Sequence, residues 1–61
     1  MTVKVQDLKK GDLIRAGWLG NGWHEVFLIE ECGFDSSKMH MNIEGFKACD
    51  IDKDREVECQ G

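Results

Sequence analysis

The segment from Val3 to Ile14 alternates apolar and polar side chains around one tight turn, and this pattern restricts the chain to a β fold. Val3 and Val5 are separated by one polar residue, so one edge of the segment is apolar and the other is hydrated. Gly11 can adopt a positive φ without a Cβ clash, and Asp12 can accept hydrogen bonds from nearby backbone N–H groups. The segment therefore predicts two short strands joined by a turn.

Strand patterns recur along the rest of the chain, at spacings of roughly eight to twelve residues with turn residues between them. No segment carries apolar residues at i, i+3, i+4 and i+7 together with capping residues, so helices are not expected. The best strand runs from Trp23 to Glu31. The other predicted strands cover residues 3–5, 12–16, 38–44, 46–51 and 55–59.

Two local features around the longest predicted strand refine this picture. Asn21 and Gly22 both accept a positive φ, so they predict a tight hairpin turn before the strand. The run from Val26 to Ile29 is apolar on both faces. Such a strand is either central in its sheet or covered by another element or another subunit, and the run therefore also permits a homodimer.

The size of the chain sets a further limit. Its 61 residues hold one domain, which we place over residues 1–61. A charged fraction of 33% and a hydrophobic fraction of 41% are typical of a folded globule. No apolar run is long enough to span a bilayer and no signal sequence is evident, so we expect a cytoplasmic protein with no membrane partner.

The pattern VxVxxLxxGDxI that begins at Val3, followed by a hairpin and a strand up to Ile29, resembles the opening of SH3-like small β-barrels. The resemblance covers residues 3–29. It implies an all-β fold, a five-stranded SH3-like barrel, in which closure removes exposed strand edges. Families that share this opening have unrelated functions, so the resemblance implies no activity.

The predicted core draws apolar residues from every strand segment. Its members are Val3, Val5, Leu8, Ile14, Trp23, Val26, Phe27, Leu28, Ile29, Met39, Met41, Ile43, Phe46 and Val57.

Charge favours a protein partner over nucleic acid. The net charge is −4, and residues 21–61 carry ten acidic and four basic side chains. Phosphate backbones are bound by lysine and arginine, whereas an acidic surface suits a basic site on another protein. We therefore expect a non-enzymatic protein-binding module. A small, acidic chain without a catalytic motif also fits an accessory protein of a phage or other mobile element that binds a host protein.

Trp18, Leu19 and Trp23 are the predicted partner-binding anchor, because they surround a glycine-rich loop. In SH3-like barrels the corresponding loop often lines a ligand groove, and aromatic side chains there give large, rigid contacts. An exposed Trp18–Leu19 pair would form an apolar patch. The acidic turn with Asp50, Asp52 and Asp54 is predicted to steer a basic partner. This turn is not an EF-hand loop, since its sixth position is an arginine instead of glycine.

Two alternative functions use other residues. A nucleic-acid-binding barrel would place phosphates on the basic N-terminal third and stack bases on the tryptophans. Its phosphate-binding residues would be Lys4, Lys9, Lys10 and Arg15.

A structural zinc module would use cysteine thiolates and imidazoles. The candidate ligands are Cys32, Cys49 and Cys59 with His24 or His40, but no two cysteines form a Cys-x-x-Cys pair. We therefore assign no metal ligand and no cofactor. No catalytic motif is present, so an enzyme is not expected.

Overall fold

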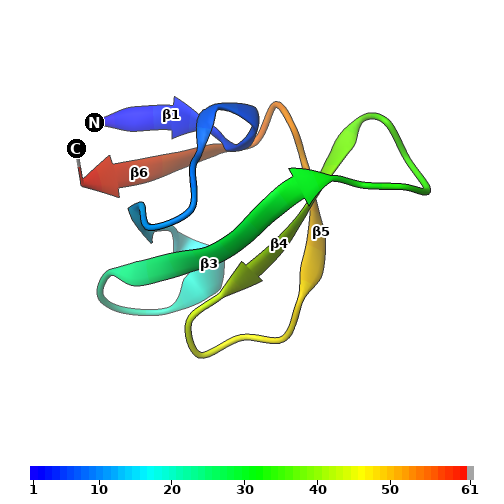
Figure 1. The fold of residues 1–61 in the computed structure, drawn as a ribbon. Helices are drawn as coiled ribbons and strands as arrows, with labels where there is room; N and C mark the ends of the chain where they lie inside the picture. Colours follow the sequence, from blue (N-terminus) through cyan, green and yellow to red (C-terminus); the bar gives the residue numbers. More distant parts are fainter. Residues whose placement is uncertain (61) are drawn as a thin grey trace.

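The computed structural model describes residues 1–60 and is built from six antiparallel strands (Figure 1). Gly61, the last residue of the predicted domain 1–61, lies outside the described residues. The strands are β1 (Thr2–Lys4), β2 (Leu13–Arg15), β3 (His24–Glu31), β4 (Lys38–Ile43), β5 (Cys49–Asp52) and β6 (Glu56–Gln60).

Two three-residue 3-10 turns, η1 (Val5–Asp7) and η2 (Gly17–Leu19), interrupt the N-terminal part of the chain. Within residues 1–60, no helix is both long and apolar enough to cross a membrane. The all-β class predicted from the sequence is confirmed, and each predicted strand segment overlaps one observed strand.

The strands lie in the order β1-β6-β2-β3-β4-β5, and β1 and β5 form two open edges. The predicted five-stranded barrel is therefore wrong, because the sheet has six strands and does not close. β1 ends at Lys4, where η1 turns the chain out of the strand, and its three residues pair with β6. The Val5 N–H donates to the Arg55 carbonyl at 2.8 Å, and the Gln6 N–H donates to the Lys53 carbonyl at 3.2 Å. These bonds join the segment after β1 to the turn between β5 and β6, and no ladder pairs β1 with β5 among the described residues.

Strand β3 is shared by the two halves of the sheet and crosses between them (Figure 1). Its first residues pair with β2, with His24 opposite Ile14, and the rest of the strand pairs with β4, from Val26 to Glu31. At the other end of the order, β1 pairs with β6 through Thr2 opposite Glu58. The N-terminal residue is held at the same edge, since the Cys59 N–H donates to the Met1 carbonyl at 2.6 Å.

The core confirms most of the predicted residues and adds two. The buried cluster comprises Val5, Leu8, Ile14, Leu19, Val26, Met39, Met41, Ile43, Val57 and Cys59. Val3 and Ile29 are partly buried against this cluster, as expected for core residues at its margin. Leu19 and Cys59 are the additions. Trp23 was predicted in the core but is only half-buried and lies outside the cluster.

A β-bulge in β3 corrects the prediction for Phe27 and Leu28. The register with β4 shifts between Val26 and Leu28, so one extra residue is inserted in β3. Residues on either side of such an insertion lose strict alternation. Val26 is therefore buried and Ile29 packs on the core, while Phe27 and Leu28 stay 44% and 40% exposed. Both were predicted in the core.

Two loop predictions also change. The Phe46 N–H donates to the Ile43 carbonyl at 2.9 Å, in a turn, so the strand predicted from residue 46 begins only at Cys49. Phe46, predicted in the core, is 40% exposed for this reason. The hairpin predicted at Asn21-Gly22 does connect β2 and β3, which pair antiparallel, but the connection is longer than a two-residue turn. Of these two residues, Gly22 has a positive φ, of 88°, and Asn21 does not, while η2 occupies part of the connection between β2 and β3.

The bulge predicts that the same polar substitution destabilises the protein to different degrees at positions 26 and 28. Val26→Thr should lower the free energy of unfolding by about 1–3 kcal/mol, because it buries a hydroxyl without a partner. Leu28→Thr should change it by less than about 1 kcal/mol, because that side chain already contacts water. Urea unfolding of both variants and of the wild type measures the difference. Strict alternation without a bulge would place both side chains inward and make the two variants equally unstable.

Candidate functional site

A pocket of about 260 Å³ opens where β3 ends and the β3–β4 loop begins. It lies on β3, β4, β5 and this loop. Its walls are formed by Glu30, Glu31, Cys32, Gly33, Phe34, His40 and Asp50. The set combines three carboxylates, one imidazole, one thiol and one phenyl ring.

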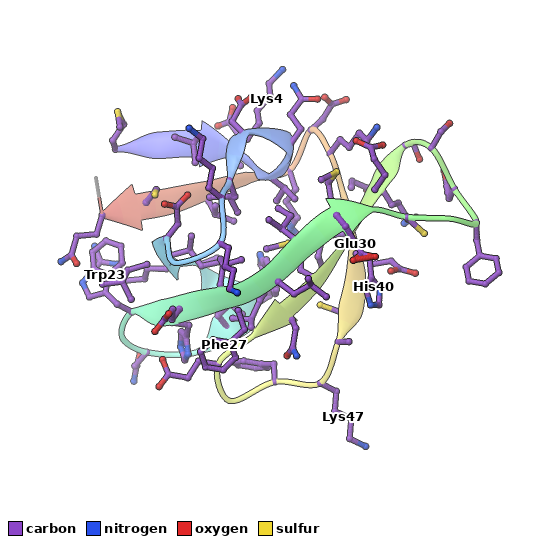
Figure 2. The ribbon with its side chains drawn as sticks, in the orientation of Figure 1. Lys4, Trp23, Phe27, Glu30, His40 and Lys47 are labelled. Atoms are coloured by element: carbon purple, nitrogen blue, oxygen red, sulfur yellow. The ribbon has the colours of Figure 1, made fainter. Side chains whose placement is uncertain are left out.

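Three of these side chains form a row across three neighbouring strands. Glu30 on β3 is directly opposite His40 on β4, and His40 is directly opposite Asp50 on β5. Residues directly opposite in an antiparallel pair share one face of the sheet, with their Cβ atoms only about 5 Å apart. Figure 2 shows Glu30 and His40 together at the end of β3. The pairing therefore places an imidazole between two carboxylates.

The contact between His40 and Asp50 is direct. His40 Nδ1 lies 2.8 Å from Asp50 Oδ1, and both side chains are partly exposed. This hydrogen bond is the main reason why the pKa of Asp50 lies below its usual range, and the nearby Cys32 thiol and Lys38 charge lower it further. The carboxylate of Asp50 is thus held in its ionised form within the pocket.

The remaining carboxylates differ in their partners. Glu31 forms an ion pair with Lys53, whose Nζ lies 2.6 Å from Oε1. Among the described residues, Glu30 takes part in no side-chain hydrogen bond or ion pair. Lysine and arginine therefore do not neutralise the row of Glu30, His40 and Asp50 by direct contact. The electrostatics of the pocket favour a positively charged group.

Phe34 projects from the β3–β4 loop beside this pocket and is 99% exposed. The loop behind it is held by local hydrogen bonds. Ser37 donates to Asp35 Oδ1 from its backbone N–H at 2.9 Å and from its hydroxyl at 2.6 Å. These bonds also lower the pKa of Asp35. A fully exposed phenyl ring on an ordered turn is an apolar contact surface with no partner in the described chain.

The predicted tryptophan anchor is arranged differently from the expectation. Leu19 is only 2% exposed and belongs to the core, so the exposed Trp18–Leu19 pair is not formed. Trp18 is half-buried, with the Arg55 guanidinium 5.2 Å from its ring centroid. Trp23 is half-buried, with the Arg15 guanidinium 4.6 Å from its ring centroid. Arginines thus cover part of both rings.

The predicted acidic residues are split between two environments. Asp50 lies in the pocket, whereas Asp52 forms an ion pair with Lys38 at 3.0 Å. Asp54 lies in the turn after β5 and approaches Lys4 at 3.9 Å. The structure therefore brings one of the six predicted partner-binding residues into the pocket.

Sequence reasoning did not select Glu30, Phe34 or His40 as partner-binding residues. A usable signal was present, because a turn centred near residue 35 pairs position 30 with position 40. The predicted outward orientation of His40 in the alternating 38–44 segment agrees with this register.

The basic residues proposed for nucleic acid do not form a continuous basic surface. Lys4 approaches Asp54, and Arg15 bonds Glu58 at 2.7 Å. Lys9 and Lys10 are exposed in the turn before β2. Carboxylates thus alternate with the cations on this part of the sheet, which weakens the attraction for phosphates.

The candidate zinc ligands are not brought together. Within residues 1–60, no three histidine, cysteine, aspartate or glutamate side chains are placed to hold a metal ion. The three cysteines are unpaired thiols in the described chain. Burial raises the pKa of Cys49 and of Cys59.

Comparisons of the chain with protein-family models, curated proteins and solved structures found no match.

Loss of the His40 ring should change the ionisation of Asp50. Because the hydrogen bond from His40 is the largest cause of the lowered pKa, His40→Ala should raise the pKa of Asp50 toward its usual value. The ionised form of Asp50 stabilises the fold above the unfolded pKa, and this stabilisation is lost as pH falls through the folded pKa. The variant should therefore lose less stability on acidification. Carboxyl ¹³C NMR titration measures the pKa directly.

Lys47→Ala is the matched control, since Lys47 lies in the β4–β5 loop away from His40 (Figure 2). It should leave the pKa of Asp50 unchanged. An Asp50 titration that is identical in His40→Ala and the wild type would show that the 2.8 Å contact does not persist in solution.

The thiols of Cys49, which is half-buried, and of Cys59, which is buried, should react slowly in the folded protein. The reactive form of cysteine is the thiolate, and burial raises the pKa of Cys49 and Cys59. At neutral pH both should be alkylated by iodoacetamide much more slowly in the native state than in urea. Peptide mass mapping over time gives each rate. Equal rates in the two states would contradict the burial of these side chains.

Proposed function

We propose that the protein is a non-enzymatic protein-binding module that holds a basic side chain of its partner in the pocket of Glu30, His40 and Asp50. One observation carries the proposal. The pocket contains carboxylates with no lysine or arginine in direct contact with the row, and it opens beside the fully exposed ring of Phe34. A lysine or arginine side chain complements both features.

The chemistry of such a contact is well defined. A guanidinium or ammonium group forms charge-assisted hydrogen bonds to carboxylates, which are about twice as strong as neutral ones. The same cation is attracted to the face of an aromatic ring within about 6 Å. The volume of about 260 Å³ lies below the range of roughly 300–1,000 Å³ typical of small-molecule sites. It suits one side chain better than a whole cofactor.

The charge of the whole chain supports the same class of partner. A net charge of −4 repels acidic surfaces and accelerates the approach of basic ones. Asp52 ends β5 and Asp54 lies in the turn after it, where Lys38 and Lys4 approach them, so both would act on a partner through the net charge of the chain and not as free carboxylates. Their predicted steering role thus forms part of the proposal.

A cytoplasmic location belongs to the proposal as well. Three unpaired thiols in so short a chain suit a reducing compartment, where cysteines remain free. The accessory role in a phage or mobile element and the homodimer stay predictions.

NMR with a matched pair of probes tests the proposed function. A blocked Gly-Arg-Gly tripeptide, titrated to millimolar concentration into ¹⁵N-labelled protein, should shift the amides of residues 30–34, His40 and Asp50. The analogue with citrulline in place of arginine should not shift them, because it has the same shape without the charge. Equal shifts from both peptides, or shifts confined to β1 and β6, would contradict the proposal.

Variants locate the contact within the pocket. Glu30→Gln and Phe34→Ala should each weaken binding of the arginine peptide about threefold or more, since each removes one exposed interaction. Glu56→Gln removes an exposed carboxylate on β6, and Phe27→Ala removes an exposed ring on the bulge. These two controls should leave the affinity unchanged. Controls that weaken binding as much as the pocket variants would indicate non-specific attraction.

A further inference from the structure

We infer that His40 is a proton-operated release switch for the bound basic side chain. The inference rests on the proposed function and adds its regulation. In the neutral state the pocket accepts a cation between Glu30 and Asp50. When the ring is protonated, a fixed positive charge stands in the same place and the cation is expelled.

The hydrogen bond to Asp50 determines how the neutral ring can act. An ionised carboxylate can only accept hydrogen bonds, so the neutral ring donates from Nδ1 to Asp50 Oδ1 across the 2.8 Å contact. The other ring nitrogen, Nε2, then carries a lone pair and is an acceptor. A guanidinium or ammonium N–H in the pocket can donate to it.

Protonation of the His40 ring changes both the hydrogen bonding of Nε2 and the charge of the ring. Nε2 becomes an N–H donor, so it can no longer accept a hydrogen bond from the cation. The ring also gains a full positive charge, and two like charges at close range repel. The position of Asp50 need not change, because the Nδ1 donor is present in both states. The switch therefore requires no rearrangement of the backbone.

Charged or titratable side chains face His40 from both neighbouring strands, β3 and β5. Glu30 faces it from β3 and Asp50 faces it from β5, while the Cys32 thiol lies on the pocket wall. The next pair along β4 and β5 is the Lys38–Asp52 ion pair, which carries no net charge.

Imidazole is the one group of this set whose ordinary titration falls between about pH 5 and pH 8. Carboxylates ordinarily titrate below that window and thiols above it. The pKa of Asp50 is lowered further by its surroundings, so Asp50 stays ionised throughout the window. A change in affinity within the window that His40→Gln abolishes would thus report on His40.

The test measures the affinity of the blocked Gly-Arg-Gly peptide at about pH 7.5 and about pH 5.5, on either side of the ordinary imidazole range. We expect the wild type to bind about fivefold more weakly at the lower pH, the small end of the usual range of coupling between sites. By reciprocity, saturating peptide should make His40 harder to protonate by the same factor. The His40 ring ¹H–¹³C signal follows that protonation directly.

His40→Gln is the decisive variant, because glutamine keeps an N–H donor and an acceptor but cannot take up a proton in this range. Whatever the affinity of this variant for the peptide, its dissociation constants at the two pH values should be nearly equal. Lys47→Ala should bind the peptide about fivefold more weakly at the lower pH, as the wild type does. Well-dispersed ¹⁵N spectra at both pH values confirm that each variant is folded.

The outcomes separate the two proposals. Binding at the higher pH that is unchanged at the lower pH overturns the switch and leaves the proposed function intact. A pH dependence that persists in His40→Gln also overturns the switch, since it would then arise from His24 or from the fold as a whole. A complete lack of binding at the higher pH overturns both.

Discussion

The bulge in β3 is the constraint on which the rest of the structure depends. Side chains alternate strictly along a strand, and one inserted residue exchanges the two faces for every position that follows. The turn near residue 35 fixes the pairing of residues 28–31 with β4, and the insertion after Val26 lets Val26 also face the core. Ile29 packs on the core and Glu30 joins the outer row with His40. The bulge therefore allows one strand to supply both the buried Val26 and the outward-facing Glu30.

The same strand also explains how so short a chain builds a core. β3 pairs with β2 at its start and with β4 along the rest, so a single strand serves two halves of the sheet. A domain of this size buries only about 60% of its unfolded surface, and every buried side chain therefore counts. Leu19 supplies one of them from a 3-10 turn and not from a strand. Arginines over Trp18 and Trp23 cover two more large side chains from outside.

The sequence was most informative where its pattern had a clear period. The alternation over 38–44 correctly placed Met39, Met41 and Ile43 inside, and the polar turn at Gly11 has the expected positive φ of 95°. The run from Val26 to Ile29 has no such period, because apolar residues on both faces fit any phase. The bulge was therefore not predictable from it. The open edges follow from the order of the strands, which no local pattern encodes, and the pocket also needs the pairing of His40 with Asp50 across the irregular β4–β5 connection.

The pairing of β1 with β6 has a consequence for the way the protein acquires its structure. Thr2 lies opposite Glu58, so partners at this edge are separated by almost the whole described chain. Contacts between residues far apart in sequence must overcome the entropy of closing a long loop, and chains rich in them fold slowly. During synthesis on the ribosome, β1 cannot pair until β6 has emerged. Until then β6 is missing from between β1 and β2, and the apolar face beneath it stays open to water.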